Sequence, residues 1–530
     1  MNKRTHFFVT RPFTRCLCLT LCLMLLFLSA CSHAKDTETD QQNEQNDTLI
    51  YAGESVTTIN PVLNTHDEIV DLIFSGLLKY DGTGQPIEDL AESYSYDRTE
   101  MTYTFLLRSG VTWHDGTPFT AADVVFTYRL LMEDSTLAGS LRDNYQDIAS
   151  VSAADDHTVV FTMKAYNANM PGYFTIGILP AHLLEGEDLT TSSFNQNPIG
   201  TGRYAFSDWD RTQGTITLVC NEQYYGTVPS IKQILYKTVS EESTKATMLA
   251  SGEADLAWLN ASYADTFREK DGFTNWDFDT ADYRGVSMDM SCTFWKENGD
   301  SIAVLNYAID KNAIINGVLK GQGTLAYSPI QMNALGTNYE ADCYYYDTTR
   351  FAEEMTQLGW EMGSDGIYCR NGVRFHFTVQ VREYEEERVS LATVVSSMLA
   401  SVGVEMEVIC VTSFDFSGAY DGFLSGYAAP FDPDTVYGQF VTGGSENTMH
   451  YSNAQIDEIL TLARHTEEPE KRLALYGDFE VEYARNPGIL LIAYLKGNYV
   501  STDRLTGPDI TRILGHHAAG IFWNMEEWTI

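Results

Sequence analysis

Hydrophobic and polar residues alternate strictly over residues 374–381, and this period of two predicts a β-strand. Over residues 385–402 the hydrophobic residues recur at helical spacing instead, and Gly403 is placed to end that helix. Residues 404–411 have the composition of a second strand. A strand, a helix and a strand in this order predict parallel pairing of the two strands beneath a covering helix.

A similar pattern occurs earlier in the chain. Residues 231–239 predict a strand, and Ser240 is a candidate N-cap for the helix that follows, with two glutamates in its first turn. Gly252 is placed to end this helix before a short strand at 254–259. We therefore expect a second unit of strand, helix and strand.

Two further helices are expected closer to the N-terminus. One covers residues 69–78, and the other covers 124–132 with Asp123 as its cap. The tetrapeptide at 115–118, Asp-Gly-Thr-Pro, is typical of turns. Alternating strands and helices predict an α/β fold.

The N-terminal segment has the pattern of an export signal. Four basic residues and no acidic one accompany the apolar run Cys16–Phe27, which is too short for a stable membrane-spanning helix. Cys31 directly follows small residues and resembles the bacterial lipobox, in which such a cysteine is lipidated and becomes the first residue of the mature protein. We predict a signal peptide at 1–30, lipidation at Cys31, and a polar, flexible tether at 31–47.

Composition indicates a large, acidic globular protein. Of the 530 residues 44% are hydrophobic, enough for two or three domains. The net charge is −39, and removal of the signal peptide with its four basic residues makes it −43. Such a surface repels nucleic acid, so we expect no nucleic-acid partner. It is compatible with cationic ligands, although acidity can also serve solubility alone.

Cysteines and short motifs give little sign of catalysis. The five cysteines after Cys31 are widely spaced without a CxxC pair, which argues against a zinc or redox site. One disulfide is conceivable, between Cys343 and Cys369. The sequence contains no phosphate-binding loop of the G-x-x-x-x-G-K-[ST] type, no HExxH helix and no GxSxG elbow. Two distant catalytic carboxylates of a glycosidase would leave no such motif.

Several longer motifs resemble one known family, the family-5 extracellular solute-binding proteins, which are peptide- and nickel-binding receptors of ABC importers. The resemblance extends from about residue 48 to 530, and the motifs occur in the family's order. They lie at residues 76–81, 90–93, 105–108, 113–124, 197–204, 252–256, 305–311 and 431–434.

The resemblance implies a two-lobed periplasmic-binding-protein-like fold of type II with an extra subdomain in the first lobe. We expect the first lobe at 48–274, with the inserted subdomain at about 80–200. The second lobe would cover 275–495, and residues 496–530 would return to the first lobe. The lobes would close on the ligand by hinge motion. An ABC permease would be the protein partner, and no cofactor is implied.

The loop after one strand of the second lobe is the expected ligand contact. Oligopeptide-binding members bind the peptide amine there with an Asp, but this chain has Ala428, Ala429 and Pro430 before Asp432. The loop also resembles nickel-binding members, in which aromatic residues match Tyr427 and Phe431. These two residues would line the cleft with Asp432, or they would only pack the loop.

Arg382 and Arg284 are candidate clamps for a ligand carboxylate, because Arg382 ends a strand where open α/β sheets present ligand-facing residues. The alternative for Arg382 is a surface ion pair with a neighbouring glutamate. If the ligand is a metal chelate, candidate metal-binding side chains are His66, His450 and His517.

Three functions follow in order of preference. The first is a lipid-anchored, extracytoplasmic receptor that captures peptides and delivers them to an ABC permease, without being an enzyme. The second is a nickel or metal-chelate receptor of the same family. The third, a remote alternative, is an extracellular hydrolase.

Overall fold

The computed structural model describes residues 47–64, 68–331, 344–428, 431–515 and 520–530. Residues Leu49–Ile530 form one compact unit, distinct from Met1–Thr48. The predicted signal peptide, Cys31 and nearly all of the tether lie outside the described residues, as do His66 and His517. In the described part of the chain, no helix is long and apolar enough to cross a membrane.

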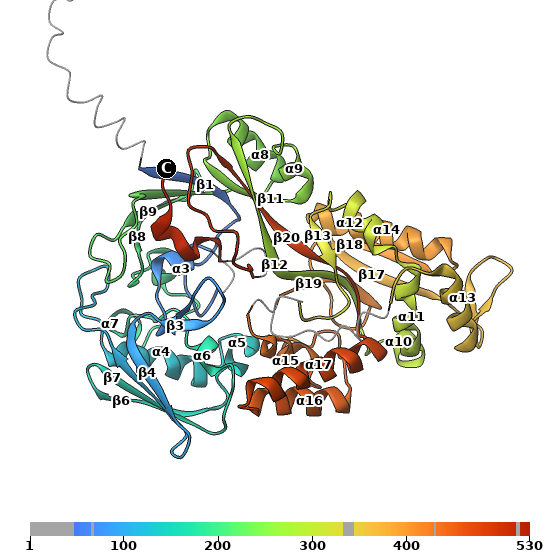
Figure 1. Cartoon of the computed structure of the whole chain (residues 1–530), viewed down its shortest axis with the longest axis horizontal. Coiled ribbons are helices and arrows are strands. Elements are labelled where there is room, and N and C mark those ends of the chain that lie inside the picture. Colours follow the sequence, from blue (N-terminus) through green and yellow to red (C-terminus); the bar gives the residue numbers. More distant parts are fainter. Residues whose placement is uncertain (1–46, 65–67, 332–343, 429–430, 516–519) are drawn as a thin grey trace, which may run out of the picture. The chain divides into compact units, whose positions relative to one another are not determined.

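Two long antiparallel strands, β12 (Phe273–Met288) and β20 (Ile489–Thr502), lie at the centre of the main sheet (Figure 1). We call the elements before β12, together with the chain after β20, the first lobe, and the elements between these strands the second lobe. The predicted domain boundaries stay predictions.

The sheet continues from the central strands into both lobes, in the order β18-β17-β19-β12-β20-β11-β1-β10-β9-β8, with β13 also paired to β20. The strands on the first-lobe side are β11 (Leu256–Leu259), β1 (Thr48–Gly53), β10 (Gln233–Thr238), β9 (Thr215–Cys220) and β8 (Tyr204–Asp210). Those of the second lobe are β19 (Gly422–Tyr427), β17 (His376–Arg382), β18 (Glu405–Val411) and β13 (Gly323–Leu325).

The strand-helix-strand unit predicted in the second lobe is confirmed. Strand β17 pairs in parallel with β18, and helix α14 (Glu386–Ser401) connects them. Gly403, two residues after the helix, has a φ of +88°, a left-handed conformation that favours glycine. The local pattern therefore specifies this unit correctly.

The earlier unit, β10-α8-β11, is also present, with α8 at Glu242–Ser251. Its two strands are not neighbours, because β1 lies between them. The predicted cap is wrong: Glu241 occupies the N-cap position, and the Ser240 hydroxyl is hydrogen-bonded to the Ser55 hydroxyl at 2.8 Å. Gly252 ends the helix with a φ of +77°, as predicted.

The first lobe contains a separate sheet in the order β4-β5-β7-β6. Its strands are β4 (Ala91–Asp97), β5 (Thr102–Leu107), β7 (Thr158–Met163) and β6 (Ile148–Asp155). Helix α4 (Ala121–Glu133) packs on β6. The predicted start of this helix is wrong by three residues, because Thr120 is the N-cap and Asp123, at the third helical position, accepts the Thr120 N–H in a capping box.

The helix predicted at 69–78 is also wrong in length. Helix α3 covers only Val70–Ile73, and Leu78 already begins strand β2 (Leu78–Tyr80). The backbone at Gly76 passes so close to another segment that a Cβ there would lie 2.4 Å from the Thr175 carbonyl oxygen. Leu78 N–H donates to the Phe174 carbonyl at 3.1 Å. These contacts require an extended chain where the periodicity suggests a helix.

The remaining helices and strands connect these sheets or cover them. In the first lobe they are β3 (Pro86–Glu88), α5 (Gly139–Asp143), α6 (Met170–Tyr173), α7 (Ala181–Leu184), η1 (Ser193–Gln196), α9 (Ala261–Asp265) and η7 (Ile521–Glu527). In the second lobe they are α10 (Thr293–Asn298), η2 (Gly299–Ser301), α11 (Ile302–Leu305), η3 (Asn306–Ala308), α12 (Lys311–Gly317), α13 (Thr348–Gln357), β14 (Glu361–Met362), β15 (Tyr368–Arg370), β16 (Val373–Arg374), η5 (Pro433–Val436), α15 (Tyr437–Phe440), α16 (Ala454–His465) and α17 (Pro469–Arg485).

Each lobe has its own hydrophobic core. The first-lobe core includes residues of the C-terminal segment, because Phe522 packs edge-on against Tyr51 of β1 with ring centroids 5.6 Å apart. The second lobe has one cluster beneath β17 and α14 and another around α16 and α17. The cluster of the first lobe and the two clusters of the second lobe share no residue.

Asp123 tests the capping interpretation. Its buried carboxylate accepts N–H groups of Thr120 at 2.9 Å and Ala181 at 3.0 Å, so Asp123→Ala leaves both donors without this acceptor. We expect the free energy of unfolding to fall by about 3 kcal/mol, measured by urea denaturation. The control is Asp188→Ala, which removes an exposed acceptor of the Thr190 N–H and should change little. Equal effects of the two substitutions would contradict the interpretation.

Candidate functional site

The Phe-Asp-Pro-Asp loop after β19 is fixed by two ion pairs to helices of the same lobe. The Asp432 carboxylate accepts two hydrogen bonds from the Arg472 guanidinium of α17, at 2.8 and 2.5 Å. Asp434, which is 1% exposed, accepts from Arg464 of α16 through Nη2 at 2.8 Å and through Nε at 3.0 Å. The predicted ligand residue Asp432 therefore already has a protein partner.

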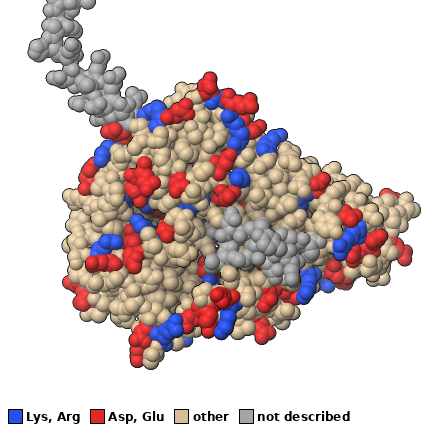
Figure 2. All heavy atoms as spheres, viewed as in Figure 1, with Lys and Arg blue, Asp and Glu red and all other residues tan. Residues whose placement is uncertain are grey.

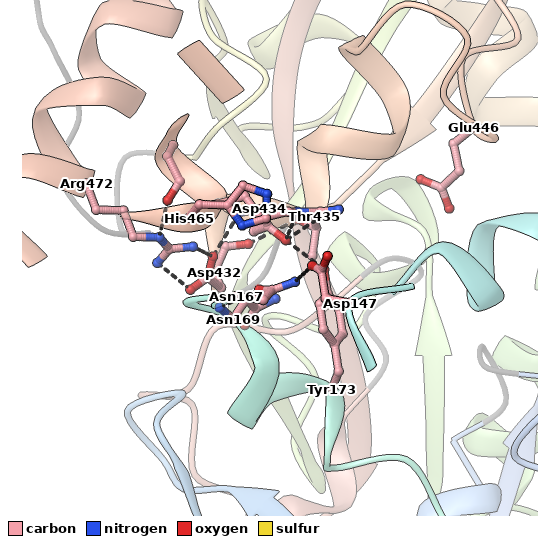
Figure 3. A network of polar contacts seen from close by, with 12 residues as sticks. Asp147, Asn167, Asn169, Tyr173, Asp432, Asp434, Thr435, Glu446, His465 and Arg472 are labelled. Atoms are coloured by element: carbon pink, nitrogen blue, oxygen red, sulfur yellow. Dashed lines mark hydrogen bonds and ion pairs between the residues drawn. The ribbon is translucent and has the colours of Figure 1, made fainter. Parts of the chain in front are cut away.

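Polar contacts from this loop and α16 reach across to the first lobe (Figure 3). The Tyr173 hydroxyl of α6 donates to Asp434 Oδ2 at 2.9 Å. The Ala168 N–H donates to the Arg464 carbonyl at 2.9 Å, and His465 Nδ1 donates to the Tyr166 carbonyl at 2.6 Å. Asp434 thus holds a cation of its own lobe and a hydroxyl of the other lobe at once.

A cavity of about 450 Å³ lies at this junction, and both lobes line it. Its walls carry several aromatic rings, the Asp432–Arg472 pair and two further acidic side chains. The lining residues are Tyr80, Gly84, Gln85, Pro86, Tyr94, Tyr166, Ala168, Asn169, Pro171 and Gly172 of the first lobe, and Phe431, Asp432, Glu467, Pro469, Glu470, Arg472, Leu473 and Tyr476 of the second.

Phe431 is an aromatic contact between the lobes. Its ring centroid is 4.5 Å from that of Tyr80, and the guanidinium carbon of Arg512 lies 5.0 Å from the same ring. The ring also covers Gly84, where a Cβ would lie 2.2 Å from Phe431 Cδ1. Sequence reasoning found Phe431, but its partners come from segments far away in the chain.

Tyr427 lies at the end of β19, and its hydroxyl has two protein acceptors. It donates to the Thr435 carbonyl at 3.1 Å and to the Glu446 carboxylate. Burial raises the pKa of the Tyr427 phenol, and burial likewise raises the pKa of the Glu446 carboxyl. The hydroxyl is therefore engaged within the protein, and a role of this ring in ligand binding stays a prediction.

The two predicted arginine clamps also pair with carboxylates of the protein. Arg284 is 4% exposed, and its Nη1 donates to Asp282 Oδ1 at 2.6 Å. It lies against β19, where a Cβ at Gly426 would be 2.2 Å from this Nη1. Arg382 Nη1 is 3.5 Å from Glu385 Oε1, which corresponds to the alternative of a surface pair. Ligand contacts of either arginine stay predictions.

Of the three candidate metal-binding histidines, the structure describes only His450. Its Nδ1 lies 2.9 Å from Asp289 Oδ1, and the side chain is about half exposed. Within the described ranges no group of three or more His, Cys, Asp or Glu residues could hold a metal ion. Cys369 is a free thiol, and its suggested partner Cys343 lies outside the described residues.

A carboxyl that sequence reasoning missed joins β1 to β20. Glu68 accepts the Tyr51 hydroxyl at 2.5 Å and is also hydrogen-bonded by the Tyr499 hydroxyl. Burial raises the pKa of this carboxyl from 4.5 to about 7, although the two hydroxyls act in the opposite direction. No local pattern could have revealed this, because Tyr499 lies 431 residues away.

Sequence comparisons with known proteins identify one family. The family model described as bacterial extracellular solute-binding proteins, family 5, matches residues 85–448. Oligopeptide-binding protein AppA of Bacillus subtilis is 24% identical over 547 residues, covering 96% of this chain and 97% of its own. Protein XP55 of Streptomyces lividans is 28% identical over 467 residues, covering 85% and 84%.

Solved structures give the same result for the fold. NikZ from Campylobacter jejuni in complex with Ni(L-His) is 32% identical, with a TM-score of 0.83, covering 92% of this chain and all of that chain. AppA from Bacillus subtilis in complex with a nonapeptide is 22% identical, with a TM-score of 0.78, covering 91% and 98%. These matches confirm the predicted family resemblance and the predicted fold class.

Glu68 generates a prediction for pH dependence. Its pKa in the folded protein is about 7, above the ordinary value of 4.5, so the folded protein holds this proton more tightly than the unfolded chain. Ionisation of the carboxyl therefore lowers the free energy of unfolding. The contribution of the protonated carboxyl is complete below about pH 4.5 and is lost as the pH rises through 7. That shift corresponds to about 3 kcal/mol.

The measurement is urea denaturation of wild type and Glu68→Gln between pH 4.5 and 8. We expect the stability of wild type, relative to the variant, to fall steadily across this range. The control is Glu269→Gln, an exposed residue of the same lobe. A difference between wild type and Glu68→Gln that does not change with pH would contradict the raised pKa.

Proposed function

The chain belongs to the family-5 bacterial extracellular solute-binding proteins, and on that premise we propose that it is a receptor that captures peptides between its lobes for an ABC importer. The observation that carries this proposal is the junction itself. One cavity of about 450 Å³ has walls from both lobes, and Tyr173 of the first lobe hydrogen-bonds Asp434 of the second. A ligand bound there touches both lobes and favours their closure.

The chemistry of the cavity supports a peptide as ligand. Its aromatic walls, among them Tyr80, Phe431 and Tyr476, offer apolar surface to side chains of varied size. Because Asp432 is already paired with Arg472, recognition of a peptide amine would fall to other acids, of which Glu470 lines the cavity and is exposed. Of the predicted ligand residues, we propose Phe431 and Asp432 as parts of this wall.

A second candidate is a nickel chelate. The observation that favours it is the 32% identity, over 92% of this chain, to NikZ in complex with Ni(L-His). The predicted metal ligands for this reading remain His66, His450 and His517. A peptide and a histidine chelate share one chemical feature, the carboxylate group.

Export and anchoring complete the proposal. The family is extracytoplasmic, and we infer that residues 1–30 are removed as a signal peptide and that Cys31 is lipidated. The partners would be the membrane, through this anchor, and the transmembrane subunits of an ABC permease. A protein of this family binds and hands over its ligand, so we propose no catalytic residue.

Ligand screening tests the proposed function. Native mass spectrometry of the purified protein, and thermal shifts with a peptide library or with Ni²⁺ plus free L-histidine, distinguish the two ligands. A ligand at 100 times its Kd should stabilise the folded protein by about 2.7 kcal/mol. Stabilisation by nickel and histidine that His450→Ala or His517→Ala abolishes would establish the second candidate. Failure of every peptide and every chelate would overturn both.

Tyr173→Phe tests lobe closure. The variant loses the hydrogen bond to Asp434, while Asp434 keeps Arg464, so only the interlobe contact is lost. Because a hydrogen bond to a charged acceptor contributes about 1.5–3 kcal/mol, we expect Kd to rise by about tenfold or more for any ligand, measured by calorimetric titration.

The matched control is Tyr145→Phe. The Tyr145 hydroxyl donates at 3.1 Å to the Tyr173 carbonyl, within the first lobe. This variant should lose some stability but keep its ligand affinity. If the two variants bind ligand equally well, the Tyr173–Asp434 contact does not contribute to closure.

A further inference from the structure

We propose that Arg512 binds a carboxylate of the ligand, together with the indole N–H of Trp523. This inference rests on the proposed receptor function and names the chemical group that the receptor selects. Arg512 follows β20 in the C-terminal segment, and Trp523 belongs to η7 in the same segment. Neither residue was singled out by the sequence.

Arg512 is buried, and no ion pair joins it to a carboxylate of the described residues. It is 8% exposed, and its guanidinium carbon lies 5.0 Å from the ring centroid of Phe431 and 5.5 Å from that of Trp523. Among the described residues no carboxylate lies within ion-pair distance of it, and its buried Nε has no hydrogen-bond partner. A buried cation without a counterion is unfavourable, so this site favours an anion.

Among the described residues, the other buried arginines have carboxylate partners. Arg464, Arg472 and Arg284 each hydrogen-bond an aspartate. Arg203, close to Arg512, is paired with Glu526 at 2.5 Å. Asp71 and Asp81 are near enough to influence Arg512, yet burial and the positive charge of Arg203 lower its pKa to about 10. It still carries its charge at neutral pH.

Trp523 supplies a second, independent sign of a missing acceptor. Its indole Nε1 is buried and has no hydrogen-bond partner in the described part of the chain. Buried donors are nearly always paired. Here two donors, Arg512 Nε and Trp523 Nε1, have no partner among the described residues, and the Arg512 guanidinium carbon lies 5.5 Å from the indole ring centroid. A carboxylate matches the guanidinium fork and has a further lone pair for an N–H donor.

The site also depends on both lobes. Arg512 and Trp523 belong to the first lobe, whereas Phe431 comes from the second-lobe loop and lies over the guanidinium. Phe431 excludes water from the cation only when the lobes are together. A bound carboxylate would therefore be strongest in the closed state, where a charge-assisted hydrogen bond is least screened.

The first experiment uses ligand. Calorimetric titration compares a bound peptide with its C-terminally amidated form, and Ni²⁺–L-histidine with Ni²⁺–imidazole, which lacks the carboxylate. For whichever pair the wild type binds, we expect the carboxylate form to bind at least tenfold more tightly. Arg512→Gln should reduce that ratio to about one, while Arg485→Gln, at an exposed arginine of α17, should leave it unchanged. An unchanged ratio in Arg512→Gln would overturn the proposal.

The second experiment needs no ligand and therefore remains decisive if the proposed function fails. Thermal unfolding compares Arg512→Gln with Arg203→Gln, an arginine of the same lobe whose side chain is 12% exposed and has a glutamate partner. Removing an uncompensated charge should leave the Tm unchanged or raise it, whereas Arg203→Gln should lower the Tm by several degrees. An equal loss in both variants would show that Arg512 is a structural residue and overturn its role as an anion site.

Discussion

The buried carboxylate of Asp434 interacts with both lobes at their junction. It is compensated within its own lobe by Arg464 and accepts a hydrogen bond from Tyr173 of the other lobe. Compensation by Arg464 does not depend on closure, because both residues belong to the second lobe. The hydroxyl contact adds to it from the first lobe, so the Asp434 carboxylate joins both lobes.

The neighbouring carboxylate of Asp432 is likewise paired with an arginine of its own lobe, Arg472. The loop therefore offers neither a free anion nor a free cation to a ligand. Each charge of the loop is neutralised before a ligand arrives, so the loop presents mainly the Phe431 ring to the first lobe. Net recognition of charge must come from groups left without partners. Acidic side chains are spread over the molecular face in Figure 2, and they give the surroundings a negative field.

Local patterns in the sequence predicted local structure well. The β17-α14-β18 unit follows from periodicity and from Gly403, both of which act over a few residues. Asp123 was mistaken for an N-cap because an acid at the third helical position and an acid at the cap look alike in sequence. The helix at 69–78 was too long because Gly76 passes the distant residue Thr175, which no local pattern records. For the site, Phe431 was found by family resemblance, whereas Arg472 and Arg512 owe their positions to tertiary contacts.

The combination of a strongly acidic protein and a buried, unpaired cation has a physical consequence. At physiological salt the Debye length is about 8 Å, so the surface carboxylates act on an approaching anion only at short range. Inside the junction the lower dielectric would strengthen the attraction of Arg512 for a carboxylate, and the Phe431 ring lies 5.0 Å from the guanidinium carbon. The surface charge would then slow the arrival of anionic ligands, while the buried cation would slow their departure. If Arg512 binds a ligand carboxylate as proposed, its contribution to affinity would therefore lie mainly in the dissociation rate.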